Sequence, residues 1–301
     1  MTTRPAQSPM TGILLMITAF ALFSVLDASA KQLMPHLPAG VVVLGRYVFG
    51  VAFIAAAGWP VWRSAMWRTH HPRIQLLRGL LMTLATLFNF IAVKYLQLAQ
   101  TSAILFSAPL WVCALSPLML GERVGWRRWA AVLTGFAGVM IVIRPGLGGF
   151  HPAMLLSLLA ALTLALYQIL TRRVGGRDAA IASLLWSSGA AMLFSLPLLA
   201  AGVAAPHGWQ WGFLALAGLT GSAGHFLLTE AHRRAPASLL APFVYSQLGW
   251  MILIGWLWFA DVPDVWTVLG ALVVAASGLF VYYRERASAR RDVLSGLEEG
   301  V

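Results

Sequence analysis

Long apolar runs separated by short polar connectors fill the chain from residue 11 to residue 283. A helix that crosses a membrane needs about 20 mostly apolar residues, and the runs have this length. The pattern therefore predicts an all-α integral membrane protein with ten transmembrane helices. The expected spans are 11–33, 39–58, 75–96, 101–120, 128–145, 152–171, 179–200, 210–230, 238–259 and 265–283.

The first run also has features of a cleaved signal peptide. Arg4 precedes it, and Ala28-Ser29-Ala30 resembles a cleavage site. However, the run includes both Asp27 and Lys31, and nine more spans are expected after it. We therefore expect the first run to remain as a transmembrane helix.

Composition narrows the class of protein. The chain is 59% hydrophobic and only 10% charged, with a mean hydropathy of +0.78, whereas a soluble domain is about a quarter charged. The net charge of +11 is typical of nucleic-acid binders, but here the basic residues stand in short clusters between apolar runs. We therefore expect a lipid bilayer and no nucleic acid as the partner. The single cysteine, Cys113, lies within an apolar run and has no metal-ligand spacing.

Basic residues are concentrated on alternate connectors, which predicts the orientation. Cytoplasmic loops carry an excess of Lys and Arg. With a cytoplasmic N-terminus, the outer side holds only Lys31, Lys94 and Arg144. The chain is thus expected in the cytoplasmic (inner) membrane with both termini inside. The inner side holds residues 4, 63, 68, 73, 123, 127, 128, 172, 173, 177, 233, 234, 284, 286, 290 and 291, all arginines.

The two halves of the chain resemble each other. Asn89-Phe90 aligns with His225-Phe226, and 122–138 resembles 261–278. Because each half has an odd number of helices, the halves must enter the membrane in opposite directions, as in secondary transporters. The expected organisation is 10–145 (helices 1 to 5), 150–283 (helices 6 to 10) and a basic cytoplasmic tail at 284–301.

Several motifs resemble the EamA repeat of the drug/metabolite transporter superfamily. They are Ala108-Pro109-Leu110-Trp111, the stretch 121–129 and Gly135-Phe136-Ala137-Gly138-Val139. The resemblance covers about 10–283 and implies ten helices in two inverted repeats, a central cavity and transport without ATP hydrolysis. Asp27 with Lys31, Arg46-Tyr47 and Arg78-Gly79-Leu80-Leu81 are similar to a branch that includes bacterial riboflavin and S-adenosylmethionine uptake carriers.

Charged residues inside the expected spans are candidates for function, because charges in a bilayer are costly unless paired. Asp27, Lys31 and Arg46 fall at related depths and can form one charged cluster. Such a cluster can be a structural ion pair between two helices, a gate or a site for a charged substrate group. Arg78 lies near the cytoplasmic end of its span, where snorkelling explains it.

Polar and aromatic residues near mid-span are candidates for a substrate cavity. Aromatic faces with a few amide groups suit a flat heteroaromatic or amino-acid-like substrate, although Trp and Tyr also pack helices. An imidazole in such a cavity can exchange a coupling proton or simply bond a neighbouring helix. The candidates are Asn89, Trp111, Tyr167, Gln168, His225, Tyr245 and Gln247.

Glycines recur every three residues at Gly218, Gly221 and Gly224. Small residues at this spacing favour close approach of helices. No phosphate-binding loop, nucleophile elbow or zinc motif occurs, and no cofactor is expected. The sequence therefore favours a secondary transporter of a small metabolite, such as riboflavin or S-adenosylmethionine. The alternatives are an exporter of amino acids or drug-like metabolites and an integral membrane enzyme.

Overall fold

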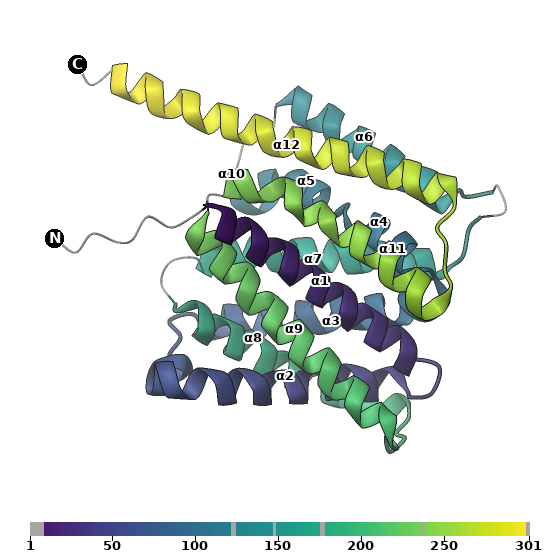
Figure 1. Cartoon of the computed structure of the whole chain (residues 1–301). Coiled ribbons are helices and arrows are strands. Elements are labelled where there is room, and N and C mark those ends of the chain that lie inside the picture. Colours follow the sequence, from purple (N-terminus) through teal and green to yellow (C-terminus); the bar gives the residue numbers. More distant parts are fainter. Residues whose placement is uncertain (1–8, 122–124, 147–148, 175–177, 236, 299–301) are drawn as a thin grey trace.

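The computed structural model describes residues 9–121, 125–146, 149–174, 178–235 and 237–298. Over these residues the chain is helical and contains no β-strand (Figure 1). The α-helices are α1 (Pro9–Leu33), α2 (Ala39–Trp62), α3 (Pro72–Tyr95), α4 (Leu98–Leu105), α5 (Ala108–Leu120), α6 (Trp126–Ile143), α7 (Ala153–Val174), α8 (Ala180–Ser195), α9 (Trp209–Arg234), α10 (Ala237–Leu240), α11 (Ser246–Phe259) and α12 (Val265–Glu298). Short 3₁₀ segments are η1 (Arg63–Trp67), η2 (Leu196–Ala201) and η3 (Ala241–Tyr245).

Within the described ranges, seven segments are long and apolar enough to cross a membrane. They are Met10–Leu33, Ala39–Val61, Pro72–Tyr95, Leu98–Met119, Ala153–Thr171, Ala180–Ala201 and Trp209–Arg234. The apolar helices Trp129–Ile143 and Val265–Phe280 are shorter. The helix that contains the last predicted span continues beyond it: α12 runs on to Glu298, because the arginines and alanines beyond residue 283 are good helix formers.

Two helices are interrupted at matching places in the two halves. The predicted span 101–120 is divided at Phe106-Ser107, between α4 and α5. The predicted span 238–259 is divided among α10, η3 and α11. Pro109 and Pro242 lie at these interruptions and cannot donate a backbone hydrogen bond. Helices broken in this way border binding sites in many carriers.

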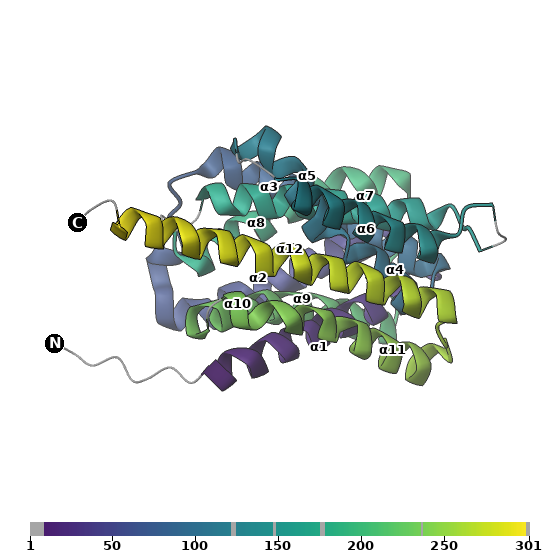
Figure 2. The ribbon, with the colours of Figure 1, turned by 90° about the horizontal axis from the view of Figure 1, so that it is seen from above.

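The main helix contacts occur in matching pairs: each contact has a counterpart in which the corresponding helices of the two halves are exchanged. α1 packs along α9 and α7 along α3, while α2 packs on α9 and α8 on α3. α6 and α12 pack on each other along one edge of the bundle, with α2 and α8 toward the opposite edge (Figure 1). The start of α1 and the end of α12 lie at the same end of the bundle (Figures 1 and 2). We call this end the terminal end and the other the opposite end.

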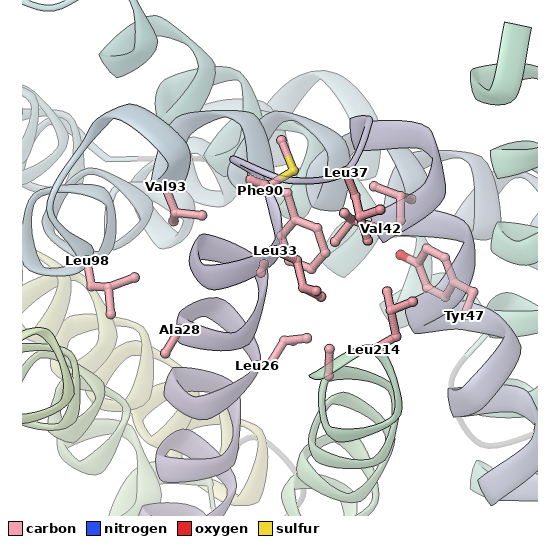
Figure 3. Packing of buried hydrophobic residues seen from close by; sticks show 14 of the residues in the cluster. Leu26, Ala28, Leu33, Leu37, Val42, Tyr47, Phe90, Val93, Leu98 and Leu214 are labelled. Atoms are coloured by element: carbon pink, nitrogen blue, oxygen red, sulfur yellow. The ribbon is translucent and has the colours of Figure 1, made fainter. Parts of the chain in front are cut away.

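The largest buried cluster joins α1, α2, α3 and α9 (Figure 3). Leu33, Tyr47, Phe90 and Leu214 contribute to it, and each is at most 3% exposed. Many large apolar side chains instead lie on the outer surface, including Leu118, which is 84% exposed. In a membrane, exposed apolar side chains contact lipid tails instead of water. Exposed apolar residues on the outer surface are therefore expected of a bundle that lies in a bilayer.

The glycines of α9 allow close helix contacts, which confirms the packing interpretation. A β-carbon on Gly218 would lie 2.5 Å from Cβ of Phe49 and 2.8 Å from the carbonyl oxygen of Arg46. A β-carbon on Gly224 would lie 2.7 Å from the ring of Phe23. The backbone of α9 therefore approaches α1 and α2 at positions where a side chain does not fit.

We expect Gly218→Ala to lower stability by about 1–3 kcal/mol, because the added methyl group overpacks the contact between α2 and α9. Gly212→Ala on the same helix is the control, since a β-carbon there would meet no neighbouring atom within 4 Å. The midpoint of thermal unfolding in detergent measures both. Equal midpoints for the two variants would show that α9 does not approach α2 closely.

Candidate functional site

Within the described helices, three charged residues are buried: Asp27 on α1, Arg46 on α2 and Arg78 on α3. They are 5%, 6% and 3% exposed, respectively. All three belong to the first half of the chain. A charge held this far from water needs partners inside the protein, and the partners define the site.

Asp27 is paired with Asn89 across the α1–α3 contact. The Nδ2 of Asn89 donates a 2.8 Å hydrogen bond to Oδ1 of Asp27. The other end of the amide, Oδ1 of Asn89, is buried and has no hydrogen-bond partner. The pair therefore presents a carboxylate and a free carbonyl oxygen, both of which accept hydrogen bonds.

Arg46 is held by hydroxyl groups and aromatic rings. Its Nη1 donates to Oγ1 of Thr86 and, at 2.9 Å, to the hydroxyl of Tyr47. The Tyr47 hydroxyl lies 2.9 Å from the carbonyl oxygen of Met82 and donates to it. The guanidinium also lies 5.8 Å from the centre of the Phe90 ring. These contacts fix the orientation of the guanidinium without neutralising its charge.

The single cluster predicted for Asp27, Lys31 and Arg46 is wrong for Lys31. Its Nζ forms a 2.7 Å ion pair with Asp261 and donates to the carbonyl oxygen of Leu96. Lys31 lies one turn nearer the opposite end than Asp27, so its long side chain reaches the α11–α12 connector instead. No direct ion pair joins Asp27 to Arg46, two residues that the structure describes, although their charges interact through space.

Polar contacts connect the two halves at the opposite end of the bundle. Besides the pair between Lys31 and Asp261, Arg144 forms an ion pair with Asp264. The amide of Gln97 donates to the carbonyl oxygen of Val262 at 3.2 Å. We call these three contacts the opposite-end bridge. Each joins the first half to the connector before α12.

Asp178 makes the corresponding connection at the terminal end. Its carboxylate accepts hydrogen bonds from Oγ1 of Thr69 at 2.5 Å, from the backbone N–H of His70 at 2.8 Å and from Nε2 of Gln75 at 3.1 Å. The side chain is only 1% exposed. Burial alone would raise its pKa, but the hydrogen bonds from Thr69, His70 and Gln75 hold the pKa well below the ordinary 3.8. We call this group the terminal-end bridge.

Arg78 extends the terminal-end bridge into the bundle, so the snorkelling expectation is wrong. Its Nη1 donates to Gln75 and Ser183, and its Nη2 donates to the hydroxyl of Tyr167 at 2.9 Å. Acceptors on α7 and α8 hold the guanidinium inside, where snorkelling would have turned it toward water. Its Nε is buried without a partner. Tyr167, a predicted cavity residue, thus contacts a buried charge.

The remaining predicted residues are distributed around the bundle. The Trp111 ring packs edge-on against Phe136 at 4.8 Å, and its Nε1 is buried without a hydrogen-bond partner. Tyr245 packs against Phe106 at 5.0 Å, and His225 against Phe23 at 4.9 Å. Gln247 is half-buried, and Gln168 is exposed. The residues that the structure brings together from the predicted set are therefore Asp27 with Asn89, and these with Arg46 nearby.

A cavity of about 310 Å³ opens between α8 and α9 at the terminal end. Ile181, Leu184, Phe226, Thr229 and Glu230 line it. His225 precedes Phe226 on the same helix and lies deeper in the bundle.

Sequence reasoning missed Asp178, Asp261 and Asp264, although one signal was present. The chain has only 10 acidic residues, and these three stand in short connectors next to apolar runs. An acid there faces basic residues on neighbouring connectors. The sequence also gave no indication that Thr86, Gln75 and Ser183 bond other helices. Ser and Thr in a helix most often bond the helix's own backbone, and an uncharged Gln gives no indication of its partner.

Comparison with known proteins agrees with this arrangement. The profile of the EamA-like transporter family matches residues 10–144 and again 151–283. An S-adenosylmethionine uptake transporter of Rickettsia felis is 25% identical, over 94% of this chain and 96% of that protein. A riboflavin transporter of Rhizobium johnstonii is 30% identical, over 93% of each chain.

Two further proteins are similar to the chain: one relative is named as an exporter, and one solved structure has a similar fold. A pseudopaline exporter of Pseudomonas aeruginosa is 26% identical, over 89% of this chain and 94% of that protein. A solved crystal structure superposes with a TM-score of 0.64, covering 91% of this chain and 97% of that one at 20% identity. At this identity the structural likeness shows the fold alone.

We expect Asp178→Asn to lower stability at pH 7 by roughly 2–3 kcal/mol, because several donors lose a charged acceptor. A carboxylate with a lowered folded-state pKa stabilises the protein fully above its unfolded pKa, near 3.8, and progressively less below it. The difference between wild type and variant should therefore shrink below pH 4.

Unfolding midpoints measured in detergent from pH 7 to pH 3 test this expectation. Glu230→Gln is the control, since Glu230 pairs with the exposed Arg233 of its own helix and such pairs contribute little. A difference for Asp178→Asn that stays constant over this pH range would mean that the carboxylate charge is unimportant.

Proposed function

The chain belongs to the EamA-like transporter family, and we propose that it is a secondary carrier that moves a small organic metabolite between its two halves by alternating access. The observation that carries the proposal is the buried polar group of Asp27, Asn89 and Arg46 together with a polar bridge between the halves at each end. Charges inside a membrane protein are retained mainly where they serve transport. A carrier that works by alternating access opens at one end of the bundle while contacts between its halves keep the other end closed. Polar contacts between the halves at both ends are consistent with such a cycle.

The proposed topology has ten crossings with the terminal end in the cytoplasm. Seven segments satisfy the length criterion, and Trp129–Ile143 and Val265–Phe280 are shorter apolar helices. The interrupted α10–α11 segment supplies the tenth crossing. The paired helix contacts support two inverted repeats at 10–145 and 150–283, and the arginine-rich connectors support a cytoplasmic terminal end.

In this proposal the opposite-end bridge closes the outer side and the terminal-end bridge closes the inner side. Each bridge consists of only a few contacts, so substrate binding can shift the balance between them. A ligand shifts such an equilibrium only by the difference in its affinity for the two states. The cavity between α8 and α9 lies at the proposed cytoplasmic side.

The substrate is proposed from the relatives and from the candidate cavity. Uptake carriers named for S-adenosylmethionine and riboflavin favour a vitamin- or nucleoside-like compound in an inner-membrane uptake carrier. The pseudopaline exporter favours the alternative of export. We propose that the substrate is bound by Asn89, Trp111, Tyr167, His225, Tyr245 and Gln247, with Gln168 turning inward only in another state. A proton or another ion is the proposed coupling partner.

The topology is tested with single cysteines at the exposed Ala205 and at Ser288, after replacement of Cys113. We expect an impermeant maleimide to label position 205 in intact cells and position 288 only after lysis. Labelling of both positions, or of position 288 alone, in intact cells would contradict an even number of crossings with cytoplasmic termini.

Alternating access is tested by locking the outer side. Cysteines replacing Lys31 and Asp261, joined by a cleavable bifunctional thiol reagent, should stop uptake into proteoliposomes, and cleavage should restore it. Labelled riboflavin, S-adenosylmethionine and amino acids serve as substrates. A cross-link between cysteines at the exposed positions 269 and 272, both within α12, is the control and should leave uptake unchanged. Full uptake through the protein locked at 31 and 261 would show that this bridge need not open.

A further inference from the structure

A shallow cavity of about 350 Å³ lies on the surface of α11, beside the connector to α12 at the opposite end of the bundle (Figure 1). We call it the α11 groove. Its walls are mostly apolar and include the exposed side chains of Leu253, Trp256 and Val262. Among the described residues that line it, Asp261 is the only charged one. None of the proposed substrate-binding residues is among them.

The α11 groove follows the axis of the helix. Gly249, Leu253 and Trp256 are separated by four and three residues, so they lie on one face of α11. At 1.5 Å per residue this apolar stripe is about 10 Å long. A β-carbon on Gly249 would meet no neighbouring atom within 4 Å, so the stripe is open at this position. One extended acyl chain can lie along such a stripe.

Asp261 stands at the end of the groove, directly after α11. Its Oδ2 accepts a 2.7 Å hydrogen bond from Nζ of Lys31, while its Oδ1 receives no hydrogen bond from the described residues. The side chain is 25% exposed, so this second oxygen can accept a donor from outside the protein. The C-terminus of α11, capped by Ala260 in the left-handed conformation, adds partial negative charge. Both features favour a positively charged group.

We infer that the α11 groove binds a zwitterionic phospholipid whose headgroup ends in a primary ammonium group, as in phosphatidylethanolamine. The ammonium group donates to Oδ1 of Asp261, and one acyl chain lies along the stripe from Trp256 to Gly249. Trp256 then contacts the region between headgroup and chain, where tryptophan is favoured in membranes. The inference requires that the protein lies in a bilayer but not that it works by alternating access.

Charge and hydrogen bonding select this headgroup among phospholipids. Lys31 and Asp261 form a neutral pair, so a lipid without net charge preserves the local charge balance. An anionic headgroup would bring uncompensated negative charge to the carboxylate. A choline headgroup is cationic but has no N–H to donate, whereas an ammonium group forms charge-assisted hydrogen bonds with a carboxylate. Unselective lipid contact would explain the apolar stripe but not the free carboxylate oxygen at its end.

Lipid binding to the purified, delipidated full-length protein in detergent tests the inference. The probes are phosphatidylethanolamine, phosphatidylcholine and phosphatidylglycerol with identical acyl chains, and native mass spectrometry gives the number of bound molecules during a titration. We expect phosphatidylethanolamine to bind roughly 10-fold more tightly than the other two, because only its headgroup donates to the carboxylate. Glycerophosphoethanolamine, which has the headgroup but no acyl chain, should bind at least about 10-fold more weakly than the lipid.

The variants separate the headgroup contact from the apolar groove. The Asp261→Asn variant should bind the three phospholipids alike. Asp264→Asn should keep the preference, because Asp264 belongs to the same opposite-end bridge but does not line the groove. Gly249→Leu should fill the groove and weaken binding of all three phospholipids. Its control is Gly212→Leu on α9, where a β-carbon also meets no atom within 4 Å.

Equal affinities of the wild-type protein for the three phospholipids would mean that lipid covers α11 without selection, and the inference would be wrong. It would also be wrong if the preference persisted in Asp261→Asn, if Gly249→Leu bound phospholipid as well as Gly212→Leu does, or if glycerophosphoethanolamine bound as tightly as the lipid. Should Asp261→Asn fail to fold, the wild-type preference and the comparison of Gly249→Leu with Gly212→Leu decide. A protein that binds the lipid selectively but transports no substrate would keep this site and lose the carrier proposal.

Discussion

Lipid tails offer no hydrogen bond to a peptide group or to a charge, so each polar group inside the bundle must find its partner within the protein. This constraint explains why the described chain is helical. It also explains why Ser24, Ser29 and Thr163 bond carbonyl oxygens of their own helices. The charges cannot be satisfied in that way. They bond side chains of other helices: Asp27 bonds Asn89 of α3, and Arg78 bonds Tyr167 of α7 and Ser183 of α8.

The symmetry of the packing does not extend to the chemistry. The helix contacts pair off when the halves are exchanged, but the charged residues buried within the described helices all lie in the first half. Asn89 of the first half is matched in the sequence by His225 of the second half. The second half instead supplies the acids of the two bridges, Asp178, Asp261 and Asp264. The first half thus contributes the charges buried within the helices, and the second half contributes the acids of the bridges.

The sequence predicted the helical class, the family and the burial of Asp27, Asn89 and Arg46 inside the bundle, because apolar length and charge within an apolar run are local signals. The sequence predicted less about which residues the buried charges contact. Asp27 and Lys31 stand at i and i+4 of one helix, which suggested a single cluster. The long side chain of Lys31 instead reaches Asp261, 230 residues away in the sequence. Arg78 was assigned to the membrane edge from its position in the run. Its acceptors come from α7 and α8, and one sequence without its fold does not bring them together.

The bridges also bear on how the protein responds to a membrane potential. Each charge moved across the membrane is worth about 2.3 kcal/mol per 100 mV, so a carrier whose charges travel along the membrane normal is driven or stalled by voltage. Lys31 and Asp261 are opposite charges at the same end of the bundle, as are Arg144 and Asp264. In the proposed cycle both members of each pair lie on the same side of the membrane, so opening the opposite-end bridge would move little net charge along the field. The electrical work of that cycle would then fall to the charge on the substrate and on the proposed coupling ion.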